Sequence, residues 1–200
     1  MKRGEENTRN PTIKRLYEAF APYSATPQTM VGCSCCVSEA DIAALFSAPL
    51  SQIPAKKVSL YSRKATTTWG NEREWKHFLP RLCELSLQEE LDFDWIGNKF
   101  SLVEWRAWPG EEVDVLHDFF NELMVSLAQN GNWFEADVWL QDLARLGENG
   151  DGGLQKWLQN AASEEIVALD RWAGKWQNAD SLLDRWMRRP EIESDLLRRL

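Results

Sequence analysis

The chain has 200 residues, of which 44% are hydrophobic and 27% are charged, and its formal net charge is −8. This composition is that of an ordinary globular protein with enough apolar material for a core. No stretch approaches the roughly 20 apolar residues that a membrane-spanning helix requires, and residues 1–10 lack the apolar region of a secretory signal. We therefore expect a cytoplasmic protein without a membrane partner, whose four cysteines are thiols or metal ligands rather than disulfides.

The negative charge is concentrated in the middle of the chain. Residues 1–85 carry 12 Lys/Arg against 8 Asp/Glu, residues 86–151 carry 3 against 15, and residues 152–200 carry 8 of each, so the segments contribute +4, −12 and 0. An acidic segment disfavours binding to nucleic acid, which needs basic contacts, and favours a basic protein partner through long-range attraction. The alternative is a solvated acidic face that keeps the protein soluble.

Helix signals dominate the first half of the chain. Asn10 followed by Pro11 is a start signal, because asparagine caps the first turn and proline suits its first position. Ser38 and Asp41 have the spacing of a capping box, and Gly70 is typical of a helix end. The helices predicted here span residues 11–20, 38–46, 54–68 and 71–90.

The last of these helices contains a conflict. Its apolar stripe begins at Trp75 and includes Cys83, whereas His77 points about 200° away from Trp75 at about 100° per residue. Pro80 lacks an amide N–H and clashes with the carbonyl four residues earlier. We therefore expect a short helix, a kink at Phe78-Leu79 and a new helix with Pro80 in its first turn, which leaves His77 on an exposed corner or aims it at a neighbouring loop.

The middle of the chain carries a period-two pattern followed by further helix signals. Leu91, Phe93 and Trp95 alternate with polar residues, which predicts an extended loop over 91–100. Ser101 to Glu104 reads as a capping box that starts a short helix ended by Trp108-Pro109. The helices predicted after this point span residues 110–128, 133–146, 154–161, 164–176, 181–188 and 190–200.

These elements predict an all-α fold, a compact array of antiparallel helix pairs. We expect a single helical domain over 1–200, with subdivision into 1–130 and 131–200 as the alternative. Similar tripeptides begin at Trp139, Trp157 and Trp176, which lie 18 and 19 residues apart. This pattern is typical of a solenoid-like C-terminal end, although chance similarity explains it as well.

A C-x-C-C run is the most distinctive chemical feature. Cys33, Cys35 and Cys36 supply three thiols and His77 supplies an imidazole, which together are a ligand set for one structural zinc ion. The run is tighter than the usual C-x2-C, so all three sulfur atoms need not reach one ion. Two alternatives remain open, namely a redox pair formed by Cys33 and Cys36, and thiols that pack as small hydrophobic groups.

The motifs give little support for catalysis, because the chain has no phosphate-binding glycine loop, H-E-x-x-H or G-x-S-x-G. We predict a non-enzymatic protein-binding protein, such as an immunity-type inhibitor that captures a basic toxin domain. Trp105 and Trp108 flank a helix end inside the acidic segment, so we expect them at the surface, where they would anchor the partner. The acidic residues that would attract it are Glu111, Glu112, Asp114 and Asp118. The alternative is a zinc-dependent or thiol enzyme centred on Cys33, Cys36 and His77.

Three further segments accompany the cysteine run: Thr68-Trp69-Gly70, His77-Phe-Leu-Pro-Arg81 and Glu104-Trp105-x-x-Trp108-Pro109. With Cys33-x-Cys-Cys-Val, this pattern resembles a family of bacterial helical proteins whose activity is uncharacterised. The resemblance covers roughly residues 30–110. It implies a bacterial origin and an all-helical fold, and it brings no activity with it.

Overall fold

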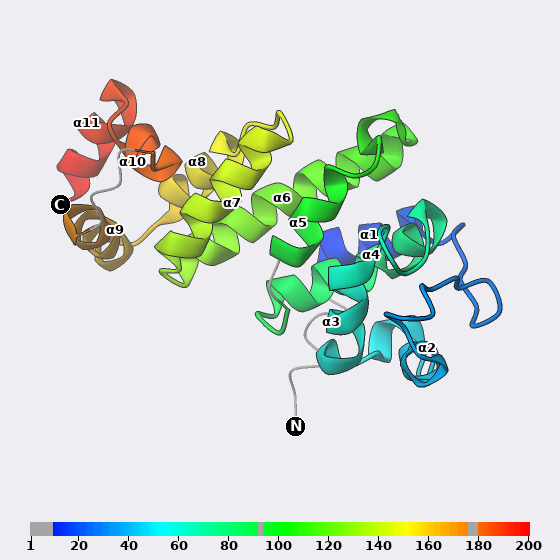
Figure 1. The fold of residues 1–200 in the computed structure, drawn as a ribbon. Coiled ribbons are helices and arrows are strands. Elements are labelled where there is room, and N and C mark those ends of the chain that lie inside the picture. Colours follow the sequence, from blue (N-terminus) through cyan, green and yellow to red (C-terminus); the bar gives the residue numbers. More distant parts are fainter. Residues whose placement is uncertain (1–9, 92–93, 176–179) are drawn as a thin grey trace. The chain divides into compact units, whose positions relative to one another are not determined.

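The computed structural model describes residues 10–91, 94–175 and 180–200 (Figure 1). Within these residues every regular element is a helix, and strand-like pairing is limited to two isolated bridges, so the all-α prediction is confirmed. None of the described helices combines the length and apolarity that a bilayer crossing needs. The chain forms two compact units, 1–119 and 120–200, whose boundary falls inside helix α6 (Gly110–Gln129).

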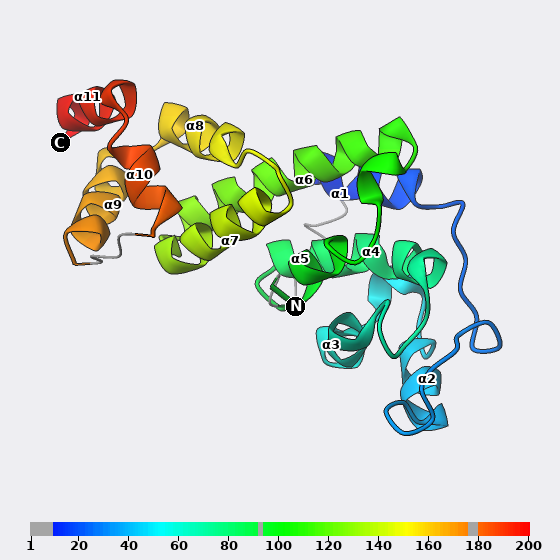
Figure 2. The same cartoon turned by 45° about the horizontal axis from the view of Figure 1, so that its top comes forward.

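Helix α4 (Glu72–Leu87) is the central element of the first unit. It contacts α1 (Pro11–Ala19), α3 (Ala55–Lys64) and the short 3-10 helix η2 (Leu50–Gln52), and it lies between α1 and α3 in Figure 2. Because neighbours cover it on several sides, buried residues occur all around α4. The unit also contains α2 (Glu39–Leu45), which packs on α3, and α5 (Asp94–Phe100).

The predicted new helix with Pro80 in its first turn is wrong, because α4 runs through Pro80 as one helix. Proline removes one backbone hydrogen bond, but Trp75, Leu79 and Leu82 on both sides of it are fully buried. Helical stability in proteins comes mainly from such packing. The capping box of Asn71 and Glu74 fixes the start of α4, since Asn71 Oδ1 accepts from the Arg73 amide at 2.8 Å and Glu74 Oε2 from the Asn71 amide at 2.9 Å.

Two predictions for residues 91–108 are also wrong. The expected loop over 91–100 contains helix α5, in which Ile96 and Phe100, four residues apart, are buried while Trp95 is 44% exposed. Phe93, part of the period-two pattern, lies outside the described residues. The expected short helix over 101–108 is reduced to the 3-10 turn η3 (Trp105–Ala107), because the Ser101 hydroxyl donates back to the Asn98 carbonyl at 2.7 Å instead of capping.

Helix α3 ends four residues before its predicted end. Its C-cap is Ala65, Thr66 then has a positive φ of 61°, and Gly70 has a φ of 69°. These left-handed residues turn the chain sharply between α3 and α4. Trp69 is 1% exposed and packs its ring edge-on against Tyr61 at 5.4 Å, which ties the turn to the core.

Within its described residues, the second unit contains the C-terminal half of α6 and five further helices. They are α7 (Trp133–Arg145), α8 (Asp151–Asn160), α9 (Ser163–Lys175), α10 (Leu182–Met187) and α11 (Pro190–Arg199). Helix α8 begins three residues earlier than predicted. The buried carboxylate of Asp137 joins α7 to α10, since it accepts from the Ser181 hydroxyl at 3.0 Å and the Leu183 amide at 2.9 Å. Trp139 and Trp157 are core residues, whereas Trp176 lies outside the described residues, so the repeat stays a prediction.

Candidate metal centre

The loop that carries the cysteines lies between α1 and α2 and is fixed to the turn between α3 and α4. Gly32 and Trp69 form an isolated antiparallel bridge, the Cys33 amide donates to the Thr68 carbonyl at 2.8 Å, and the Gly70 amide donates to the Val31 carbonyl at 2.7 Å. Within the loop, a Cβ atom on Gly32 would lie 2.9 Å from the Val37 Cβ, so only glycine fits this close to Val37. The two segments, far apart in sequence, therefore form one platform.

Within the loop the chain folds into a tight turn. The Cys33 carbonyl accepts from the Cys36 amide at 2.8 Å and from the Val37 amide at 2.9 Å. The Lys64 ammonium group, at the end of α3, donates to the Cys36 carbonyl. The turn ends where Ser38 caps α2 through its capping box with Asp41, as the sequence predicts. The backbones of Cys33 and Cys36 are thus held by local and long-range hydrogen bonds.

The turn brings the three sulfur atoms together. The Sγ atoms of Cys33 and Cys35 are 2.9 Å apart, those of Cys35 and Cys36 are 3.5 Å apart, and all three lie within 4.8 Å of one another. Thiolates bound to one zinc ion at 2.3 Å in tetrahedral geometry are about 3.8 Å apart. Cys33 and Cys35 are exposed and Cys36 is half-buried. The group is therefore able to hold a metal ion after small adjustments of the side chains.

The thiols influence one another's protonation. Hydrogen bonds from Cys35 and Cys36 lower the pKa of Cys33. The hydrogen bonds to Cys33 and Cys36, together with repulsion between the sulfur atoms, raise the pKa of Cys35 to about 11. The first thiolate therefore forms readily, whereas the next needs a nearby cation to offset the repulsion. A bound metal ion supplies that charge and deprotonates its thiol ligands.

The structure does not bring His77 to the three cysteines. Among the described residues, the cluster of ligand atoms contains sulfur alone. His77 Nδ1 lies 3.1 Å from the Tyr23 carbonyl, and its ring stacks edge-on against Phe78. Burial lowers the pKa of His77. Because α4 is not broken at Pro80, His77 stays on the helix face that α4 presents to the Tyr23 segment.

The fourth cysteine is separate from the cluster. Cys83 is fully buried on the apolar stripe of α4, as the sequence predicts, and burial raises its pKa well above the ordinary value. It therefore behaves as a small hydrophobic residue.

The expectation that Trp105 and Trp108 are exposed is wrong, since they are 2% and 8% exposed. Trp105 packs against Phe100 at 5.7 Å, and the Trp108 Nε1 donates to a carboxylate oxygen of Glu72 at 2.8 Å. Their rings fill the space between α4, α5 and the start of α6. As buried residues they are not available to anchor a partner on this surface.

Of the four acidic residues predicted to attract a partner, Glu112 is buried. It forms an ion pair with Lys76 at 2.9 Å and accepts a hydrogen bond from the Tyr23 hydroxyl at 2.6 Å. The Lys76 ammonium also lies 4.0 Å from the ring centre of Trp108 and 4.6 Å from that of Tyr23. Sequence reasoning missed this cluster, because its members come from segments far apart in the chain.

The other three predicted acids are exposed at the surface of α6. Glu111 and Asp114 form no ion pair with any described residue, whereas Asp118 pairs with Arg15 of α1. Comparison with protein-family models, with curated proteins and with solved structures found no match to the chain, so the family resemblance stays a prediction.

Proposed function

We propose that the protein binds a zinc ion through Cys33, Cys35 and Cys36. The observation that carries this proposal is the placement of three sulfur atoms within 4.8 Å of one another on one anchored turn. Thiolates are soft ligands that suit zinc and copper(I) better than magnesium or calcium. Zinc is the ion for which a three-thiolate set with one further ligand is common.

The site supplies three ligands and leaves one position for another donor. Among the described residues, no imidazole or carboxylate joins the cluster. Since Cys33 and Cys35 are exposed, water or a donor from another molecule has access to the fourth position. A zinc ion there would stabilise the turn that links α2 to the α3–α4 connection. The free energy of metal binding adds to the free energy of folding when the site forms only in the folded chain.

The metal content of the purified protein, measured by elemental mass spectrometry, tests the proposal. We expect about one zinc per chain in the wild type and loss of zinc in Cys36→Ser. Cys83→Ser is the matched control, because it removes a thiol outside the cluster and should keep the zinc. Cobalt(II) substitution adds a second readout, since a sulfur-to-metal absorption band reports thiolate ligation. Zinc that persists when all three clustered cysteines are serine would disprove the assignment.

A second candidate function is capture of a basic protein partner, as in an immunity-type inhibitor of a toxin domain. It is supported by the exposed carboxylates of Glu111 and Asp114, which no described cation neutralises. Reversing both charges to lysine should slow association with a basic toxin domain and weaken its dependence on salt. Reversing Glu191 and Glu193 on α11 is the control, and equal effects of the two pairs would argue against this surface.

A further inference from the structure

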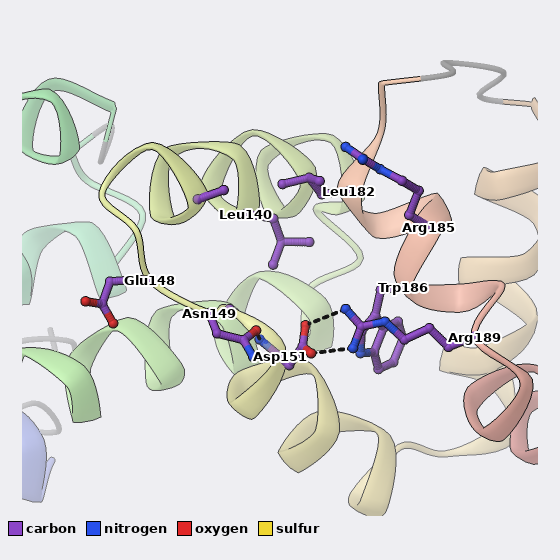
Figure 3. A pocket seen from close by; sticks show the side chains of 10 residues that line it. Leu140, Glu148, Asn149, Asp151, Leu182, Arg185, Trp186 and Arg189 are labelled. Atoms are coloured by element: carbon purple, nitrogen blue, oxygen red, sulfur yellow. Dashed lines mark hydrogen bonds and ion pairs between the residues drawn. The ribbon is translucent and has the colours of Figure 1, made fainter.

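The second unit contains a cavity of about 230 Å³ beside α10. Leu140 and Ala144 of α7 line it on one side, and Leu182 and Trp186 of α10 line it on the other. In Figure 3, Leu140 lies between Arg185 on one side and Asn149 and Asp151 on the other. The cavity therefore has an apolar middle, which suits the hydrophobic body of a small ligand.

The wall formed by α8 is held firmly in place. Arg189, which follows α10, makes two parallel hydrogen bonds with the Asp151 carboxylate, one of them 3.2 Å long (Figure 3). A Cβ atom on Gly150 would lie 2.4 Å from the Leu140 Cδ2, so the chain passes α7 as closely as glycine allows. Since the Arg189–Asp151 pair is neutral overall, it contributes rigidity rather than net charge to the cavity.

One donor at the cavity lacks a strong acceptor. The Arg185 guanidinium forms no ion pair with the described residues and donates at 3.5 Å to the Asp180 carbonyl. A carboxylate carried by a ligand would supply the missing acceptor. Trp186, which is 1% exposed, contributes its side chain to the apolar part of the lining.

The unpaired charge at the cavity is positive. Glu148 also lines it, but Figure 3 shows this side chain at the opposite end from Arg185 and Arg189. Arg189 neutralises Asp151, so Arg185 is the cation that remains for a ligand. We propose that this cavity binds a small organic carboxylate with an apolar body, whose carboxylate pairs with Arg185 and whose body packs on Leu140, Leu182 and Trp186. This proposal is independent of the metal centre.

The test is a titration of the full chain with phenylacetate, followed by the indole N–H signals in two-dimensional ¹H–¹⁵N spectra. Trp186→Phe identifies the Trp186 signal. We expect phenylacetate to shift this signal saturably at millimolar concentration, as suits a ligand of this size. Arg185→Gln should weaken binding about tenfold, because a charge-assisted hydrogen bond is lost. Arg188→Gln is the matched control, because Arg188 follows α10 but does not line the cavity.

Three results would overturn the proposal. An unchanged Trp186 signal would show that the cavity does not take this ligand class. Equal shifts with benzyl alcohol, the neutral relative of the probe, would show an apolar cavity without anion recognition. Equal weakening by Arg185→Gln and Arg188→Gln would show that the effect is general surface charge.

Discussion

Replacing Lys76 with methionine should destabilise the first unit strongly. The side chains of Lys76 and Glu112 are 6% and 5% exposed, and their charged atoms are 2.9 Å apart. Methionine keeps most of the volume of the lysine but removes the positive charge. Glu112 would then keep one hydrogen bond, from the Tyr23 hydroxyl, while its carboxylate remains buried without a counter-charge.

The expected loss of stability in Lys76→Met follows from the burial of the ion pair. Removing one member of a buried ion pair costs about 3–5 kcal/mol, mainly because the remaining charge is left unpaired. The contact of the ammonium with the face of Trp108, at 4.0 Å from the ring centre, contributes in the same direction. The exposed pair of Arg15 and Asp118, whose side chains are 49% and 48% exposed, is a control, for which Arg15→Met should cost about 0–1 kcal/mol.

The assay is urea unfolding of the full chain, combined with hydrogen exchange of the α4 amides. Exchange reports the free energy of opening in the first unit by itself. The double variant Lys76→Met/Glu112→Leu should be more stable than Lys76→Met, because replacing both charges leaves no orphaned carboxylate. If Lys76→Met costs no more than Arg15→Met, the argument from burial is refuted.

Three further predictions address other sites. Burial lowers the pKa of His77, so below pH about 6.5 the unfolded chain binds more protons at this residue than the folded chain does. The free energy of unfolding of the wild type should therefore fall more steeply with decreasing pH than that of His77→Gln. Urea unfolding at several pH values measures both slopes, and parallel slopes would contradict the prediction. In the metal-free protein Cys33 should react with iodoacetamide before Cys35, because hydrogen bonds lower the pKa of Cys33 and only the thiolate attacks. The buried Cys83 should stay unreactive until the protein unfolds. Peptide mass spectrometry gives the order of modification, and modification of Cys83 in the folded protein would count against the prediction. Asp137→Ala should destabilise the second unit by about 2–3 kcal/mol, because two buried donors, the Ser181 hydroxyl and the Leu183 amide, lose their acceptor. Ser181→Ala is the comparison and should cost about 1 kcal/mol. Thermal unfolding of both variants measures the two losses of stability.

Features set by neighbouring residues could be predicted from the sequence. Asn10 caps α1 by accepting from the Ile13 amide at 3.0 Å, and Ser38 forms the expected capping box. The clustering of Cys33, Cys35 and Cys36 also follows from their closeness in the chain. In each case the interaction spans at most three residues, so the local pattern is sufficient.

Features set by long-range packing could not be predicted in this way. The helix through Pro80 survives because side chains on both sides are buried in contacts with other helices. The position of His77 follows from that continuity and from the Tyr23 segment. The place of Trp108 at a helix end inside the acidic segment predicts a surface residue. Its ring instead covers the ammonium of Lys76, a contact that no local pattern indicates.

The same distinction limits what the charge count says about a partner. Three of the acids between residues 86 and 151, Glu112, Asp137 and Asp142, are buried. Burial raises the pKa of Asp142, and Glu112 is neutralised by Lys76, so neither contributes fully to the field that a partner meets. The attraction therefore depends on exposed acids such as Glu111. Neutralising exposed acids tests the partner hypothesis directly, whereas neutralising Glu112 would also break a buried ion pair, and a loss of binding could then follow from a loss of structure.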